Sequence, residues 1–393
     1  MSGSRFAPVL GWTYPLTALS HPREAIRQFT PNWFAATMGT GILALVLGQL
    51  PCSTIWLRAL GEGLWLFNIG LYSLFCLMYA SRWVLYFDEA KQVLGHSTVS
   101  MFFGTIPMGL ATLINGVLAY GLPRWGTSMI PLAEVLWWID VIMAMACGVL
   151  IPYLMFTRQN HSIDKMTAVW LLPVVAADVA AVSGGLLAPH LASTSSQLTV
   201  LITSYVLWAY SVPVALSVLV ILLLRMALHK LPHESMAASS WLSLGPIGTG
   251  ALGMLVLGTD APAIFATHGM VVIGHVAEGI GLIGGILFWG LGLWWMVMAL
   301  LITQKYFKTG MPFNLGWWGF TFPLGVYTVT TLKLGSMLHM AFFDVAGALL
   351  ALMLVVMWVI VVSKTFAGAY YGNLFVSPCI ASIKKSDNPS SLT

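Results

Sequence analysis

Residues 287–302 read LFWGLGLWWMVMALLI, an uncharged stretch inside an apolar run that covers residues 275–302. A helix needs about 20 predominantly apolar residues to cross the hydrocarbon core of a bilayer. The run is continuously apolar and does not alternate with period two, which favours a helix over a barrel strand. The stretch therefore predicts a membrane-spanning helix, and its recurrence along the chain predicts an all-α membrane protein.

Ten such runs are predicted, and they lie at residues 33–50, 64–82, 100–120, 134–155, 168–189, 199–225, 241–257, 275–302, 315–333 and 342–366. Only 8% of the 393 residues are charged, against about 25% in a soluble domain. We predict a cytoplasmic N-terminal segment at 1–30, a ten-helix transmembrane domain at 31–366 and a cytoplasmic C-terminal tail at 367–393.

The distribution of Lys and Arg predicts the orientation, because cytoplasmic loops hold the excess of these residues. With residue 1 inside, the outer connections hold Arg58, Arg124 and Lys333, and the other 14 of the 17 Lys and Arg lie inside. We therefore expect a multi-pass protein of the cell inner (plasma) membrane with both termini in the cytoplasm. The net charge of +4 follows from this orientation, so no nucleic-acid partner is predicted.

A regular break marks alternate runs. Pro107, Pro173, Pro246 and Pro323 lie in the first half of the third, fifth, seventh and ninth runs, with separations of 66, 73 and 77 residues. In the first run, Gly39 lies 68 residues before Pro107 within the string TMGTG. The spacing predicts five tandem helical hairpins.

A broken helix leaves backbone groups unpaired, which the membrane tolerates where the backbone lines a wet cavity or is buried in protein. We therefore predict an inner ring of odd-numbered helices around a central pore, with the even-numbered helices facing lipid. The alternative is that Pro, Gly and Thr are common in membrane helices because small residues help them to pack. That alternative gives no reason for a bias between odd and even helices.

Three strings carry a family resemblance: FTPNWFAATMGTGILAL at 29–45, LPVVAADVAAVSGGLLA at 172–188 and WWGFTFPLGVYTVTTLKLG at 317–335. They resemble the tellurite-resistance/dicarboxylate transporter family, which includes TehA-type proteins, yeast malic acid permeases and sulfite efflux pumps, and plant slow anion channels. The resemblance implies five hairpins around one anion path, homotrimers as in the TehA-like members, and a phenylalanine of the ninth helix that plugs the pore. The matching residue is Phe322, and Phe320 is the alternative.

A phenylalanine beside a proline break suits a plug, because an apolar ring in a narrow lumen blocks water and ions until it moves. The residues alone favour packing of Phe322 against lipid or a neighbouring helix, and the family resemblance reverses that interpretation. No Lys or Arg lies in the middle of an odd run, so an anion there must be held by backbone amides, hydroxyls and helix N-termini. The pore-lining or substrate-binding candidates on these grounds are Gly39, Thr40, Thr105, Pro107, Pro173, Ser183, Pro246, Thr249, Pro323 and Thr328.

Two charged residues are further candidates. Asp178 follows Pro173 by five residues, and a lumenal carboxylate that is protonated for part of the cycle would couple transport to protons. Its alternative role is a hydrogen bond between two helices. Lys333, at the outer end of the ninth run, either attracts anions to the pore mouth or extends to lipid headgroups.

The function predicted is transmembrane transport of a small anion. A malate-like C4-dicarboxylate is the first choice of substrate, and sulfite or another small anion, as in tellurite-resistance proteins, is the second. A passive channel and a proton-coupled carrier both stay open, and the alternative of another class is a membrane-embedded sensor or enzyme without flux. The histidines lie in loops or near helix ends and no Walker A string occurs, so we predict no enzyme, no cofactor and no metal.

Overall fold

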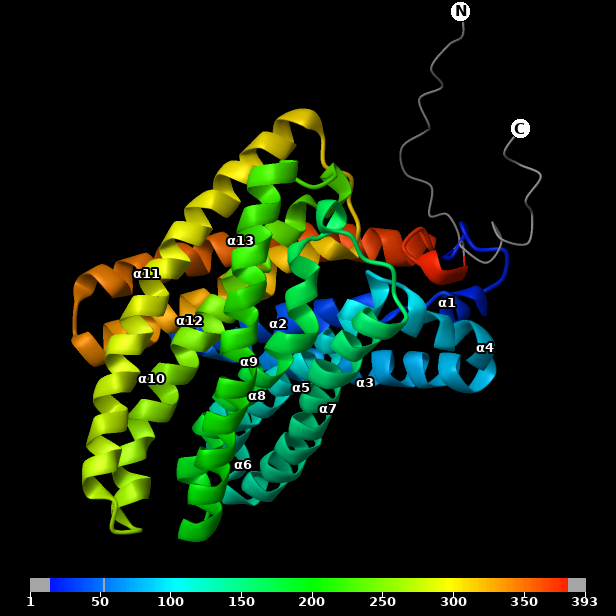
Figure 1. Cartoon of the computed structure of the whole chain (residues 1–393). Helices are drawn as coiled ribbons and strands as arrows, with labels where there is room; N and C mark the ends of the chain where they lie inside the picture. The colour runs from blue at the N-terminus through cyan, green and yellow to red at the C-terminus, as the bar shows by residue number, and fades with distance from the viewer. Residues whose placement is uncertain (1–14, 52–53, 381–393) are drawn as a thin grey trace, which may run out of the picture.

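The computed structural model describes residues 15–51 and 54–380, which form helices and no strand. Ten helices in this part of the chain occupy the predicted runs (Figure 1). Their bounds are α2 Phe34–Gln49, α3 Ile55–Leu85, α5 Thr105–Gly116, α7 Ile130–Thr157, α8 Leu172–Leu187, α9 Thr194–His229, α10 Leu244–Ala266, α11 Val271–Thr309, α12 Thr321–Leu338 and α13 Ala341–Tyr371. Within the described residues, nine helical stretches are long and apolar enough to cross a membrane. The more polar α12 is the remaining predicted span.

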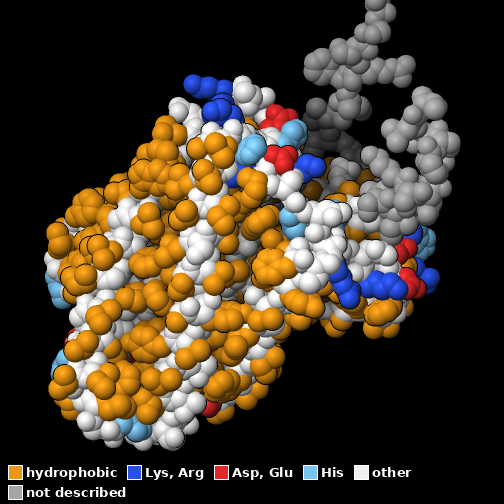
Figure 2. All heavy atoms as spheres, viewed as in Figure 1, with side chains coloured by type: hydrophobic (Ala, Val, Ile, Leu, Met, Phe, Trp, Pro, Cys, Tyr) orange, Lys and Arg blue, Asp and Glu red, His pale blue; other side chains and the backbone are white. Residues whose placement is uncertain are grey.

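The helices form an inner and an outer ring, as the sequence predicts. The two rings differ in the burial of an apolar stretch of 18 residues in each span. In the spans that contain α2, α5, α8 and α10, 78–94% of that stretch is buried. In the spans of α3, α7, α9, α11 and α13, 22–33% is buried. Fourteen of the 18 residues of α12 are buried. The inner helices contact one another in the closed order α2, α5, α8, α10, α12 and back to α2. Apolar side chains cover most of the face of the bundle that Figure 2 shows.

Each inner α-helix is preceded by a 3₁₀ segment. These segments are η1 Pro31–Trp33, η3 Val99–Gly104, η7 Ala168–Leu171, η9 Glu234–Trp241 and η10 Leu315–Phe320. The four repeated prolines lie at the second or third residue of the α-helix that follows. A proline in the first turn removes no hydrogen bond, because the amides of that turn have no partner within the helix. The expected break is therefore the junction between a 3₁₀ segment and the α-helix that follows it, and the α-helix itself is not interrupted at the repeated proline.

Five tryptophans tie the outer ring to the inner ring. Each outer helix donates one indole N–H to the inner helix of the next hairpin, and the last outer helix, α13, donates to α2. The bonds are Trp65 to the Leu113 carbonyl (3.1 Å), Trp137 to the Ala180 carbonyl (2.8 Å), Trp208 to the Gly250 carbonyl (3.0 Å), Trp289 to Thr331 Oγ1 (2.9 Å) and Trp358 to Thr40 Oγ1 (3.1 Å). These indole bonds close the ring of hairpins.

Both ends of the described chain meet at one end of the bundle, which we call the terminal end. The amide of Leu16 donates to the carbonyl of Tyr370 (2.7 Å), and the amide of Ser377 donates to Oε1 of Gln28 (2.8 Å). Charged side chains gather at this end, over α1 (Glu24–Arg27), α4 (Phe87–Ala90) and the C-terminus of α11 (Figure 2). Helix α13 continues to Tyr371, five residues beyond the predicted end of the transmembrane domain.

Candidate functional site

A cavity of about 500 Å³ opens at the terminal end, and we call it the vestibule. Residues at the start of the five inner helices, or in the segments that precede them, line it together with Asn373, Leu374, Val376 and Pro378. Its polar lining side chains are Thr30, Asn32, His96, Thr98, Ser235, Ser239, Asn314 and Asn373. Among the described residues, no Lys, Arg, Asp or Glu lines it. The vestibule is therefore a mainly apolar space with several polar side chains, and no charged residue of the described chain lines it where the inner ring begins.

Below the vestibule the path narrows to a cavity of about 10 Å³, which we call the constriction. All five inner helices or the segments that precede them contribute to it, and its lining residues are Met38, Met108, Leu171, Leu172, Val175, Leu242, Gly245, Phe322 and Pro323. Three of these, Met38, Leu172 and Leu242, also line the vestibule. A cavity needs about 10–15 Å³ to hold one water, so the buried Phe322 ring and its neighbours close the path here.

The vestibule contains one residue that titrates near neutral pH, His96. Its Nδ1 accepts hydrogen bonds from the backbone amides of Thr98 and Val99, each at 3.2 Å. These bonds leave Nε2 as the protonated nitrogen of the neutral ring. Burial lowers the pKa of His96 below its ordinary value of 6.5, because the charged imidazolium loses hydration. The vestibule therefore carries a neutral histidine at pH 7.

The hydroxyls predicted to hold an anion are engaged with backbone carbonyls in this closed arrangement. Thr105 donates to Phe102 (2.7 Å) and Pro31 (3.0 Å), Ser183 to Val179 (3.2 Å), Thr249 to Gly245 (2.8 Å) and Thr328 to Leu324 (2.7 Å). None of these four lines the vestibule or the constriction. Each hydroxyl would have to leave its carbonyl before it could donate to a passing ion.

Gly39 and Thr40 lie at contacts between helices. A Cβ added at Gly39 would stand 2.2 Å from Oγ1 of Thr321 and 2.6 Å from the Trp318 ring, so this glycine permits α2 and the start of α12 to approach closely. Thr40 accepts the indole bond from Trp358 of the outer ring. Of the predicted prolines, Pro323 lines the constriction, whereas Pro107, Pro173 and Pro246 lie outside both lining sets.

Asp178 is fully buried beside the Thr249 hydroxyl, which donates to the Gly245 carbonyl, so neither carboxylate oxygen accepts a hydrogen bond of normal geometry. Its Oδ1 lies 3.7 Å from the point where a Cβ of residue 253 would stand, which places it between α8 and α10. Asp140, on the outer helix α7, is also buried and unpartnered. Neither carboxyl lines the two cavities. Lys333 is partly exposed near the far end of α12.

Comparison with known proteins assigns a class to this path. The family model of voltage-dependent anion channels, SLAC1, matches residues 28–366. The chain belongs to the SLAC1 family. It is 37% identical over 343 residues to the sulfite efflux pump SSU1 of Arthroderma benhamiae, with 87% of this chain and 91% of the relative covered. The SLAC1 family thus includes named transporters, and this chain is a multi-pass membrane protein of an anion-transporting family and not an enzyme.

Two further relatives show the breadth of the SLAC1 family. An uncharacterized transporter of Methanocaldococcus jannaschii is 30% identical, over 92% of this chain and 99% of its own length. The malic acid transport protein of Schizosaccharomyces pombe is 25% identical, over 91% and 82%. The malate-named relative is thus less similar than the sulfite-named one, and the prediction of malate as first substrate is not confirmed over sulfite.

The sequence reasoning missed three components of the site. The sequence gives no role in the path to His96, to Met38 or to residues 373–378 of the predicted cytoplasmic tail. Met38 directly precedes Gly39 in the TMGTG string. Its apolar side chain beside this glycine is the one sequence signal for its place at the axis of the inner ring. No local pattern indicates that residues 373–378 fold back over the vestibule, because their partner Gln28 lies 349 positions earlier in the chain.

Proposed function

We propose that this protein transports sulfite, in its singly charged hydrogen sulfite form, through the path between the five inner helices. The observation that carries the proposal is the path itself: an uncharged vestibule with several polar side chains that leads to a constriction formed by all five hairpins and closed by Phe322. The similarity to sulfite efflux pumps supports the choice of ion.

The charge of the lining favours a monovalent ion over a dicarboxylate. Removing an ion from water carries a Born cost that grows with the square of its charge, and a nearby counter-charge is needed to offset it. No Lys or Arg lines either cavity in the described residues. A malate dianion would therefore lose far more hydration energy than hydrogen sulfite on the same path. Malate stays the second candidate because of the Schizosaccharomyces pombe relative.

In the proposed mechanism the anion enters the vestibule and exchanges part of its hydration for amide and hydroxyl donors. It passes the constriction when the Phe322 ring swings aside. Thr249, Thr328 and Ser183 then serve as donors along the inner helices, and Lys333 attracts or releases the ion at the far mouth. Weak donors suit passage, because a tightly bound ion does not leave.

Asp178 is our candidate for proton coupling. Burial of a charged carboxylate without a partner costs free energy, so a carboxyl in this position either holds a proton or is kept because it has a function. If it carries a proton in the cycle, Asp178→Asn will abolish the stimulation of transport by a pH gradient. A coupled carrier responds to a pH gradient at a fixed gradient of hydrogen sulfite, whereas a passive channel does not. Unchanged pH dependence in the Asp178→Asn variant would assign the residue a structural role.

The proposal is tested by flux into proteoliposomes of labelled sulfite and labelled malate, each with and without a pH gradient. We expect sulfite flux to exceed malate flux. Malate flux in excess of sulfite flux would reverse the order of the two candidates, and flux of neither anion would remove the transport proposal.

We further propose a homotrimer in the plasma membrane, with the terminal end in the cytoplasm. The excess of Lys and Arg in the connections at that end supports the orientation. Cysteine labelling of residues in the terminal loops from each side of the membrane tests the orientation. The mass of the detergent-solubilised complex tests the trimer.

A further inference from the structure

Arg82 is a buried cation whose hydrogen-bond partners are all neutral. It lies in the last turns of α3 and is fully buried. Its Nη1 donates to the carbonyl of Phe29, its Nη2 donates to the hydroxyl of Ser377 (3.2 Å), and its Nε has no acceptor. A buried charge is normally paired with an opposite charge because hydration is lost. Arg82 therefore needs another explanation.

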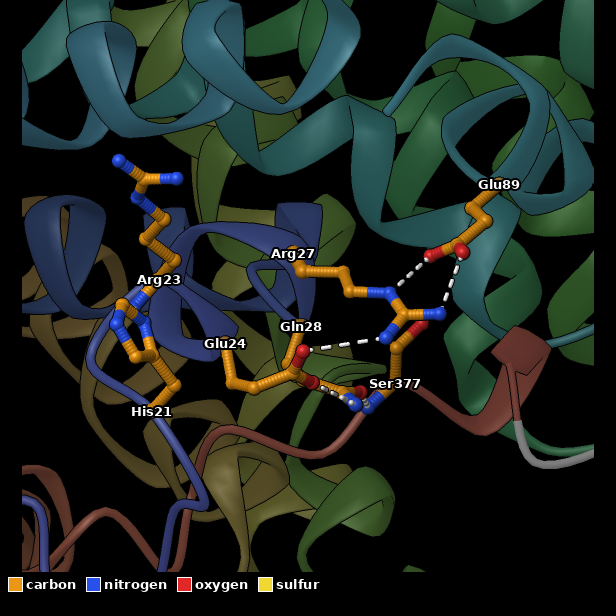
Figure 3. Close-up of polar contacts among 7 residues, drawn as sticks. All are labelled: His21, Arg23, Glu24, Arg27, Gln28, Glu89 and Ser377. Carbon is orange, nitrogen blue, oxygen red and sulfur yellow. Dashed lines mark hydrogen bonds and ion pairs between the residues drawn. The ribbon is translucent and has the colours of Figure 1, made fainter. Parts of the chain in front are cut away.

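The carboxylates nearby serve a different cation. Glu89 receives two hydrogen bonds from Arg27, at 2.6 and 2.7 Å, and Glu24 receives a third at 3.1 Å (Figure 3). The same cluster holds the C-terminal segment, because the amide of Ser377 binds Gln28 (Figure 3). Arg27 thus has hydrogen bonds to carboxylates that Arg82 lacks, and Glu89 attracts Arg82 only through space.

Arg82 stands directly behind the wall of the vestibule. Its first acceptor, Phe29, precedes Thr30, which lines the vestibule. Its second acceptor, Ser377, lies between two further lining residues, Val376 and Pro378. The guanidinium is therefore one residue behind the lining on two sides. A charge in a poorly polarisable protein interior acts over a longer distance than one in water.

We propose that Arg82 supplies the positive potential of the vestibule and draws one anion into it without touching it. This inference rests on the proposed function, since it adds the attracting charge to a path whose lining is neutral. It also explains how a lining without Lys or Arg accepts an anion at all. Arg82 acts here as a positioning residue that determines the affinity of the vestibule for a single negative charge.

The test compares variants that keep or remove the charge. Arg82→Gln should raise the half-saturating sulfite concentration for flux from the terminal end roughly tenfold, the effect of one charge about 12 Å from the ion at an effective dielectric constant near 20. The maximal rate should change little. Arg82→Lys keeps the charge and should stay within about twofold of wild type, and Ser377→Ala, which removes a neutral partner, should match wild type.

A purely structural role makes other predictions. If Arg82 only anchors residues 372–380, Arg82→Lys or Ser377→Ala will impair flux as much as Arg82→Gln, and either result overturns the proposal. Should Arg82→Gln fail to fold, Ser377→Asp serves instead. The new carboxylate would neutralise the charge of the guanidinium, and the Arg82 side chain would stay in place. A half-saturating concentration unchanged in Ser377→Asp would then overturn the proposal.

The same vesicles separate this inference from the proposed function. Absence of sulfite flux in the wild type overturns the proposed function. The role of Arg82 is then tested by calorimetry, which measures the affinity of the solubilised protein for sulfite. Wild type, Arg82→Lys and Arg82→Gln are compared. Equal binding by the three proteins, or binding by none, overturns the role of Arg82.

Discussion

Replacement of Phe322 by alanine should open the constriction. The present space there is about 10 Å³, at the limit for one water. Loss of the ring adds roughly 100 Å³, the volume of about three liquid waters. Because Met38 and Leu172 line both spaces, the enlarged constriction would be continuous with the vestibule.

The size of the effect follows from the burial of the ring. Phe322 is 3% exposed, and exposing a buried phenylalanine costs about 1.5–3 kcal/mol. If the ring must leave its site before an ion passes, removing that step speeds passage roughly 10- to 150-fold, at 1.36 kcal/mol per tenfold. Sulfite flux into proteoliposomes or current across a planar bilayer measures this increase.

Phe320 offers a matched control. It is 1% exposed and packs against Trp241 and Trp317, with ring centroids 5.8 and 5.7 Å away, but it lines neither cavity. Phe320→Ala should cost a few kcal/mol of stability, as core Phe truncations do at about 3–5 kcal/mol, without raising flux. Equal flux increases in both variants, or no increase in Phe322→Ala, would refute the assignment of Phe322 as the gate.

Three further predictions concern stability in detergent. Trp358→Phe should cost about 1 kcal/mol through loss of one hydrogen bond, and a double-mutant cycle with Thr40→Val should recover that coupling in thermal unfolding. Gly104→Ala should lower the melting temperature strongly, because its Cβ would stand 2.1 Å from a backbone carbonyl oxygen of α8, whereas Gly63→Ala meets nothing within 4 Å and should be harmless. His96 has its pKa lowered on folding, so the unfolded chain binds its proton first and stability should fall as pH drops below about 6.5; an undiminished fall in His96→Asn would contradict this.

The hydrophobic pattern was sufficient to predict the architecture. The lengths of the apolar runs predicted the positions of the membrane helices. The recurrence of Pro107, Pro173, Pro246 and Pro323 predicted which of them are inner helices, and the burial of these helices confirms that prediction. The candidate spans Val99–Trp125, Ala168–His190 and Glu234–Ala266 contain Pro107, Pro173 and Pro246 in their first halves, as predicted. The sequence did not show that the break is a change from 3₁₀ to α-helix, because a proline in the first turn of an α-helix looks the same in the sequence as one in its interior.

The site was less accessible to prediction, since it depends on which face of each inner helix meets the axis. Nearly every residue of these helices is buried, so burial gives no periodicity to read. Thr40 illustrates the difficulty: its hydroxyl lies toward the outer helix α13, although a hydroxyl on a pore helix is expected to face the lumen. The Phe322 assignment came from family resemblance, and its place in the constriction agrees with that role.

The indole bonds have a consequence for folding of the chain during its synthesis. In the first four, the tryptophan leaves the ribosome before its acceptor, so each finished hairpin presents a donor to the helix that is synthesised next. In the fifth the order is reversed, and Thr40 awaits Trp358, which follows it by 318 positions. The inner ring can close as soon as α12 meets α2, whereas the outer ring and its fifth indole bond stay incomplete until α13, the last membrane helix, is synthesised.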